Sequence, residues 1–98
     1  MIAVFVTFQY GGDFDEAKIT KIAAGARARF DGMPGLRSKL FAVRAESRQA
    51  ANVYIWESEA AAKAFFTDAM VERVTSLYGV RPSVEYAQIA ELVDNAPA

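Results

Sequence analysis

Residues 51–56, ANVYIW, are the stretch around which the rest of the chain is organised. Their aromatic and β-branched side chains predict a strand. Side chains alternate between the two faces of an extended chain, so Asn52, Tyr54 and Trp56 share one face. The chain's only indole, an amide and a phenol are therefore expected side by side.

Residues 57–66, ESEAAAKAFF, continue this strand directly into a helix. Ser58 is a favourable N-cap, and Glu59 places a negative charge in the first turn, where the helix dipole is positive. The helix brings Phe65 and Phe66 close to the strand face described above. The whole stretch therefore predicts an apolar pocket with a few polar groups.

Length and charge limit the classes of function that are open. The chain has 98 residues, which predicts a single domain, here residues 1–95, followed by a C-terminal tail, residues 96–98. Its 11 Lys and Arg residues nearly cancel its 12 Asp and Glu residues, and they are scattered instead of forming a basic stripe. We therefore expect no nucleic-acid partner.

The chain contains no Cys and no His. Thiolate catalysis, cysteine metal sites, Ser-His triads and histidine-ligated iron are excluded for that reason. We expect no metal and no cofactor. Any chemistry must use Tyr, Trp, Asn, Arg, carboxylates or the substrate itself.

The apolar N-terminal segment, residues 1–8, does not have the features of a targeting sequence. It lacks a basic region, is too short to span a bilayer, and runs into Gly11 and Gly12 without a small-residue cleavage site. We expect a cytoplasmic protein that does not enter a membrane.

The remaining segments follow from their periodicity and their breaks. Asp13 or Asp15 can cap the first helix, and the second helix is expected to be interrupted near Thr67 and Asp68 and to end before Gly79. On the second strand, Leu36, Leu40 and Ala42 are expected to alternate with Arg37, Lys39, Phe41 and Val43. The predicted ranges are a strand over 2–10, a helix over 13–30, strands over 36–45 and from 51, helices from 58 and from 67, and a strand over 83–93.

This order, β-α-β-β-α-β, is typical of the α+β ferredoxin-like fold, in which a four-stranded antiparallel sheet carries its helices on one face. The other face is then bare. The first and third strands are apolar on both sides, so that face would be a large exposed hydrophobic patch on a monomer. A homodimer formed through the open sheet face would cover it.

Several segments, in matching order and spacing over nearly the whole chain, resemble the YdhR-like monooxygenase family of the dimeric α/β-barrel superfamily. They are residues 32–36 (GMPGL), 53–58 (VYIWES), 62–66 (AKAFF), 78–79 (YG) and 93–95 (VDN). The resemblance implies a ferredoxin-like protomer, a homodimer and monooxygenase activity.

Two groups within that superfamily are informative. The cofactor-free monooxygenases that oxidise anthrones use an Asn and a Trp on this strand, and Asn52 and Trp56 resemble that pair. The haem-degrading monooxygenases carry an iron-ligating His on the next helix, where this chain has Phe66. The resemblance therefore favours cofactor-independent oxygenation of a small aromatic phenol or anthrone-type substrate over haem degradation.

For cofactor-free oxygenation we hypothesise a set of site residues. Asn52 would donate a hydrogen bond to the substrate oxygen, Trp56 would form a flat wall, and Tyr54 or Tyr78 would donate or relay a proton. Water would be excluded from the pocket by Phe30, Phe65 and Phe66. The base is left open between Glu57, Glu85, a perturbed Tyr and water.

Other functions fit the same residues. A non-catalytic dimeric domain that binds a small aromatic ligand needs the pocket alone, and a cofactor-free isomerase or lyase needs a proton-abstracting group but no oxygen. Trp56 and Tyr78 could also be plain core residues, and Tyr54 and Tyr86 interface residues. Arg37, Lys39 and Arg73 are expected to be solvated charges, although one could attract an anionic substrate.

Overall fold

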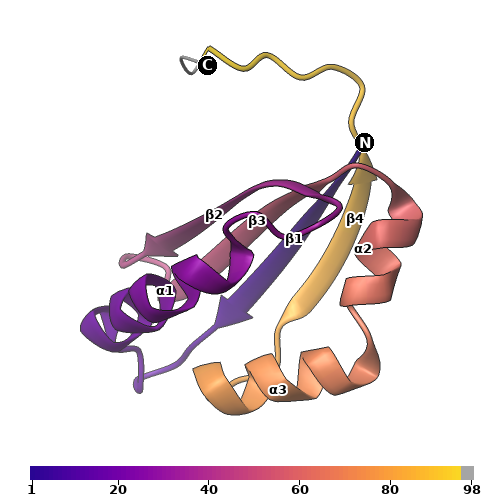
Figure 1. The fold of residues 1–98 in the computed structure, drawn as a ribbon. Helices are drawn as coiled ribbons and strands as arrows, with labels where there is room; N and C mark the ends of the chain where they lie inside the picture. Colours follow the sequence, from indigo (N-terminus) through magenta and orange to yellow (C-terminus); the bar gives the residue numbers. More distant parts are fainter. Residues whose placement is uncertain (96–98) are drawn as a thin grey trace.

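A computed structural model describes residues 1–95 and has the predicted α+β ferredoxin-like fold. Figure 1 shows the helices on one face of the sheet. The predicted tail, residues 96–98, lies outside the described residues. The elements are β1 (Ile2–Gln9), α1 (Glu16–Phe30), β2 (Leu36–Arg44), β3 (Gln49–Trp56), α2 (Glu59–Phe65), α3 (Asp68–Tyr78) and β4 (Ser83–Gln88).

The sheet has the strand order β2-β3-β1-β4, and every neighbouring pair is antiparallel. The central position of β1 agrees with its apolar sequence on both faces. The edge position of β2 agrees with its mixed and basic sequence. β2 and β3 follow each other in the chain and form an antiparallel hairpin.

The core lies between the helices and one face of the sheet. Four residues of β1 on this face, Ile2, Val4, Val6 and Phe8, are at most 3% exposed. The opposite face has no helix over it, and Phe5 there is 41% exposed. The two faces of β1 are thus both apolar, but only one is covered.

The N-cap residue determines where α1 begins. The Asp15 side chain accepts a hydrogen bond from the backbone N–H of Lys18, so α1 begins at Glu16 and not at residue 13 as predicted. The Asp13 carboxylate instead accepts from the N–H of Gly11 in the preceding turn. Of the two predicted caps, Asp15 is the one used.

The second helical region is divided in two, as predicted. Ser58 caps α2 and Thr67 caps α3, each by accepting a hydrogen bond from a backbone N–H three residues ahead. Gly79 ends α3 in the left-handed conformation, with φ of 85°. This division gives α3 a direction different from that of α2 (Figure 1).

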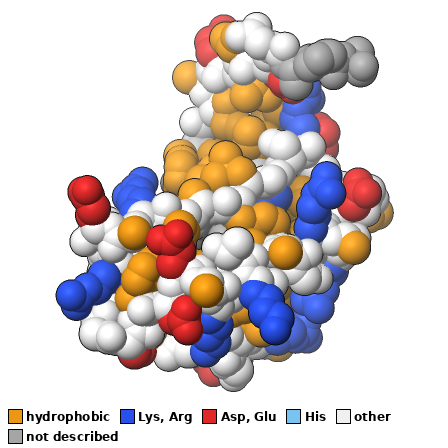
Figure 2. Space-filling view, turned by 90° about the vertical axis from the view of Figure 1, so that its left-hand side faces the viewer, with side chains coloured by type: hydrophobic (Ala, Val, Ile, Leu, Met, Phe, Trp, Pro, Cys, Tyr) orange, Lys and Arg blue, Asp and Glu red, His pale blue; other side chains and the backbone are white. Residues whose placement is uncertain are grey.

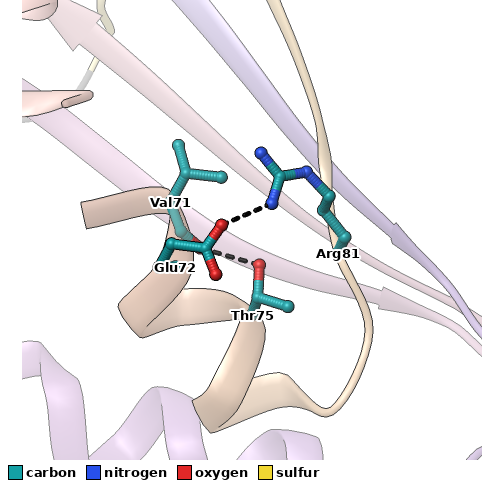
Figure 3. A network of polar contacts seen from close by, with 4 residues as sticks. All are labelled: Val71, Glu72, Thr75 and Arg81. Carbon is teal, nitrogen blue, oxygen red and sulfur yellow. Dashed lines mark hydrogen bonds and ion pairs between the residues drawn. The ribbon is translucent and has the colours of Figure 1, made fainter. Parts of the chain in front are cut away.

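The segment between α3 and β4 is tied back to α3 by an ion pair (Figure 3). Arg81 Nη1 lies 2.7 Å from Glu72 Oε1, and both side chains are more than 60% exposed. In the same helix the Thr75 hydroxyl donates to the carbonyl of Val71 at 2.7 Å. Because the ion pair is solvated, we expect it to contribute only about 0.2–1 kcal/mol.

A β-bulge interrupts the alternation of β2 near its start. Leu36 is paired with Trp56 and Ser38 with Ile55, so two steps along β2 match one step along β3. Leu36 therefore packs against the core instead of sharing the bare face with Leu40, which is 53% exposed. The predicted grouping of Leu36 with Leu40 and Ala42 is wrong for this reason.

The last strand is shorter than predicted. β4 ends at Gln88 instead of residue 93, because Gln88 is paired with Ile2 at the start of β1. Just beyond that point the N–H of Ile89 donates a hydrogen bond to the carbonyl of Met1. No helix of the described residues is long and apolar enough to cross a membrane.

The surface shown in Figure 2 carries both signs of charge. Lys and Arg side chains alternate there with Asp and Glu side chains, and hydrophobic side chains gather in the upper part of the view. This face therefore has no continuous basic stripe.

Candidate functional site

Asn52 and Tyr78 are far apart in sequence but meet in the core. Asn52 lies on the helix-facing side of β3 and is 4% exposed, and its Nδ2 donates a hydrogen bond to the Tyr78 hydroxyl at 3.2 Å. Among residues 1–95, Asn52 is the only buried residue that is charged or carries an amide or aliphatic hydroxyl. Two of the three predicted catalytic residues are thus in direct contact.

Tyr78 is held from two further sides. Its ring stacks on Phe8 with centroids 3.9 Å apart, and its carbonyl accepts a hydrogen bond from the Tyr10 hydroxyl at 2.7 Å. Burial raises the pKa of Tyr78, and the hydrogen bond from Asn52 opposes that shift. The hydroxyl is therefore protonated at neutral pH and can act as a hydrogen-bond donor.

Three cavities surround Phe41, which lines all of them. The largest, about 280 Å³, is open and lies between the end of α1 and the start of β2. The second, about 130 Å³, reaches Asn52 and Tyr78, and a small one of about 20 Å³ shares residues with both. The largest is lined by Arg27, Phe30, Asp31, Gly32, Leu36, Arg37, Ser38, Lys39 and Phe41.

The residues that line the small cavity show how the other two are related. Phe30 and Lys39 line both the largest and the small cavity, whereas Asn52 and Tyr78 line both the second and the small cavity. A volume near 280 Å³ is at the lower end of the roughly 300–1,000 Å³ typical of ligand pockets. The site is therefore suited to a small ligand.

Aromatic rings from β3 and α2 form a cluster behind the cavities. Tyr54 stacks on Trp56 with centroids 6.1 Å apart, and the Phe65 ring lies 5.2 Å from Trp56. Phe66 meets Tyr54 edge to face at 4.9 Å, and Phe30 meets Tyr54 edge to face at 6.0 Å. Of the predicted pocket residues, Phe30 and Tyr54 line a cavity, while Phe65 and Phe66 support them.

Trp56 is 2% exposed and lines none of the three cavities. Gly35 packs beside its ring: an added Cβ would lie at an ordinary contact distance of 3.9 Å from the ring, but only 3.1 Å from the Cβ of Ala61. The indole Nε1–H has no acceptor among the described residues. Tyr54 therefore separates Trp56 from the cavities, because Tyr54 lines the small cavity and Trp56 stacks on Tyr54. The role of Trp56 as a substrate wall stays a prediction.

Lys39 differs from the expectation of a solvated charge. Its Nζ lies 3.5 Å from the ring centroid of Phe30, 4.1 Å from that of Phe41 and 4.3 Å from that of Tyr54. Burial, with a smaller contribution from the positive charge of Arg29, lowers the pKa of Lys39 to about 7. The sequence signal for this site was the pattern Lys39, Phe41, Val43, a cation in register with apolar residues.

The carboxylates considered as bases lie elsewhere. Glu57 and Glu85 are exposed, and neither lines any of the three cavities. Asp31, which is also exposed, is the one carboxylate that lines the largest cavity. Within residues 1–95, no three Asp or Glu side chains are grouped so that they could hold a metal ion.

Comparison with known proteins shows the class of fold. No family model and no curated protein matches the chain, but solved structures match over nearly its whole length. Their identities to the chain are 20% or less, so the likeness shows the fold alone. That fold is the ferredoxin-like β-α-β-β-α-β fold of the antibiotic biosynthesis monooxygenases.

Three of these structures show the range of the match. A monooxygenase from the gene ActVA-Orf6 of Streptomyces coelicolor, in complex with nanaomycin D, is 19% identical, with a TM-score of 0.72 over 97% of this chain and 92% of its own. SnoaB, a cofactor-independent oxygenase from Streptomyces nogalater, is 14% identical, with a TM-score of 0.67 over 94% and 95%. A protein of unknown function from Nitrosomonas europaea is 16% identical, with a TM-score of 0.75 over 98% and 95%. The narrower YdhR-like resemblance stays a prediction.

Proposed function

We propose that this chain is a cofactor-independent monooxygenase that acts on a small aromatic substrate of the phenol or anthrone type. The observation that carries the proposal is the buried Asn52–Tyr78 hydrogen bond at cavities walled by Phe30, Phe41 and Tyr54. The fold shared with SnoaB and with the nanaomycin D complex supports it. Trp56 would form the wall behind Tyr54.

The chemistry fits a chain without His or Cys. Loss of a proton turns an anthrone-type substrate into an anion, and this anion reduces dioxygen directly. One oxygen atom forms a carbonyl at a carbon that loses two C–H bonds, and the other leaves as water, so the substrate supplies all four electrons. The protein must bind the substrate, exclude water and stabilise the developing negative charge, which the Tyr78 hydroxyl and the Asn52 amide are placed to do.

The test is oxygen uptake by metal-stripped protein with a panel of anthrones, naphthols and hydroquinones. We expect uptake above the uncatalysed background, and a fall of about 10²-fold in Asn52→Ala, the size of effect seen when one oxyanion donor is removed. Trp56→Phe should reduce uptake less. Gln49→Ala is the matched control, because it removes an amide of the same strand whose side chain bonds to Gln9 and lies outside the cavities.

The alternative functions give different results in the same experiment. Binding that quenches Trp56 fluorescence without oxygen uptake or hydrogen exchange would indicate a ligand-binding domain. Exchange of substrate C–H for deuterium without oxygen uptake would indicate an isomerase or lyase. Either result would overturn the monooxygenase proposal.

The proposed assembly is a homodimer formed through the bare sheet face. Residues there come from all four strands and are mostly small or apolar, including Phe5, Leu40, Val53 and Ile55. Glu85 is paired with Phe5 at the edge of this patch. A second copy of the chain offers the same surface, so a two-fold contact would cover both.

A further inference from the structure

We propose that Lys39 is the proton acceptor of this site, and that its amine takes the hydroxyl proton of a phenolic substrate seated against Phe30 and Phe41. This inference rests on the proposed function, because it assigns the base of the same site. It gives a role to a residue that the sequence pattern alone places among the solvated charges.

The other groups that line the cavities are poorly suited to this role. Burial raises the pKa of both Tyr54 and Tyr78, so both stay protonated at neutral pH and act as donors. Asp31 lines only the open largest cavity, away from Asn52 and Tyr78. Lys39 is half-buried, and a lysine whose pKa is lowered by burial is, in contrast, an established kind of general base.

The position of Lys39 connects the open cavity with the polar contact in the core. It lines the largest cavity, where a substrate ring would lie against Phe30 and Phe41, and the small cavity that reaches Asn52 and Tyr78. A substrate hydroxyl that enters from the largest cavity therefore meets the amine before it reaches the core.

The surroundings of Nζ disfavour the charged form until an anion arrives. No carboxylate and no hydrogen-bond acceptor of residues 1–95 contacts it, and the Arg29 guanidinium repels its charge. The three ring faces attract an ammonium by cation–π interaction, but they carry no net negative charge that could replace a carboxylate. The titratable or charged groups around it are Arg27, Arg29 and Asp31 near the end of α1, Arg37 on its own strand, Tyr54 on β3 and Tyr78 on α3.

The step is a simple proton transfer. The phenol O–H bond breaks, its electron pair stays on oxygen as phenolate, and the proton forms a new N–H bond on Nζ. The ammonium and the phenolate then form an ion pair in a partly desolvated site, where their attraction is stronger than in water. No oxidant is consumed in this step.

The first test measures the free amine without any substrate. Trace acetylation with acetic anhydride between pH 5.5 and 10.5, followed by peptide mass spectrometry, gives the reactivity of each lysine against pH. We expect Lys39 to reach half of its full reactivity near pH 7. The reactivity curves of the exposed residues Lys18, Lys21 and Lys63, recorded in the same experiment, are the comparison. A midpoint for Lys39 equal to theirs would overturn the proposal.

The second test uses 1-naphthol, whose anion absorbs at longer wavelength than the neutral phenol. At pH 8 we expect naphthol bound to the wild type to be ionised without release of a proton to the solvent, because the proton stays on Lys39. In Lys39→Met it should bind as the neutral phenol. In Lys39→Arg it should ionise with release of about one proton per bound molecule, since arginine is already charged. Lys21→Met should behave as the wild type.

The outcomes separate this inference from the proposed function. Ionisation that depends on Lys39, without oxygen uptake by any substrate, would support the base and overturn the oxygenase. Oxygen uptake that is unchanged in Lys39→Met would support the oxygenase and overturn the base. Proton release by the wild type equal to that of Lys39→Arg would show a fixed positive charge instead of a base, and no binding of naphthol would count against both proposals.

Discussion

Two buried tyrosines of the site differ in one contact. The Tyr78 hydroxyl accepts from Asn52, whereas the Tyr54 hydroxyl has no hydrogen-bond partner among the described residues. Tyr78→Phe leaves the Asn52 amide buried without its partner, so we expect a loss of about 1–3 kcal/mol in the free energy of unfolding. Tyr54→Phe should stay within about 0.5 kcal/mol of the wild type, because no bond is lost.

Urea unfolding of the two variants measures this difference directly. Both replacements keep an aromatic ring, so the stacking on Phe8 and on Trp56 is retained. Equal losses of stability in the two variants would show that the Asn52–Tyr78 contact does not contribute.

Lys39 should make the stability depend on pH. Its pKa is lowered to about 7 in the folded state, against about 10.4 in an unfolded chain. Between these values the unfolded state holds a proton that the folded state lacks, so the free energy of unfolding rises with pH from about 7 toward 10. Above pH 10 it should fall again, because burial raises the pKa values of Tyr10, Tyr54 and Tyr78 in the folded state.

Urea midpoints at pH 6.5, 8 and 9.5 test this expectation. The rise seen in the wild type should be absent in Lys39→Met and present in Lys21→Met, which changes an exposed lysine of α1. A wild type and a Lys39→Met variant with the same pH dependence would contradict it.

At the residue level, the sequence could identify the site only in part. The alternation of β3 placed Asn52, Tyr54 and Trp56 on one face, and the structure has all three buried there. Periodicity places Lys39 in register with Phe41, but it could not predict the full environment of Lys39, because its three rings come from α1, β2 and β3 and meet only in the folded chain.

At the level of elements, the Thr67 hydroxyl caps the N-terminus of α3, where α3 is divided from α2. Thr67 accepts a hydrogen bond from the N–H of Met70, so Thr67→Ala should cost about 0.5–2 kcal/mol. Thr75→Ala, in the middle of α3, is the matched control. Its hydroxyl bonds only to the carbonyl of Val71 (Figure 3), and alanine has the higher helix propensity, so no loss is expected. Thermal unfolding of both variants tests this, and an equal loss in both would contradict the capping role.

The helix and strand order was predictable because caps and breaks are local signals. Ser58, Thr67 and Gly79 act over three or four residues. Ser58 begins and Gly79 ends a helix as predicted, and Thr67 caps α3 at the predicted interruption. The end of β4 was not predictable, because it depends on where β1 begins on the neighbouring strand. The face of Leu36 was missed because a bulge leaves the alternation of apolar residues unchanged in the sequence.

For the whole molecule, the bare sheet face is the feature on which the proposed homodimer rests. If the chain is a homodimer through this face, Leu40→Lys places a charge at the contact and should give a monomer at micromolar concentration. Ala60→Lys is the matched control, because it adds the same charge at an exposed position of α2. Sedimentation equilibrium distinguishes the two, and a wild type that is monomeric at high concentration would overturn the proposed dimer.

The bulge at the start of β2 has a consequence for changes in chain length. Deleting one residue from a strand normally turns every side chain beyond it to the opposite face. Here β2 contains one residue more than β3 opposite it, between Leu36 and Ser38. Removing Arg37 should therefore restore regular pairing and leave both Leu36 and Lys39 facing the helices, whereas removing Ala42 should turn Val43 away from the core. We therefore expect the fold to tolerate deletion of Arg37, the extra residue of this edge strand, better than deletion of Ala42.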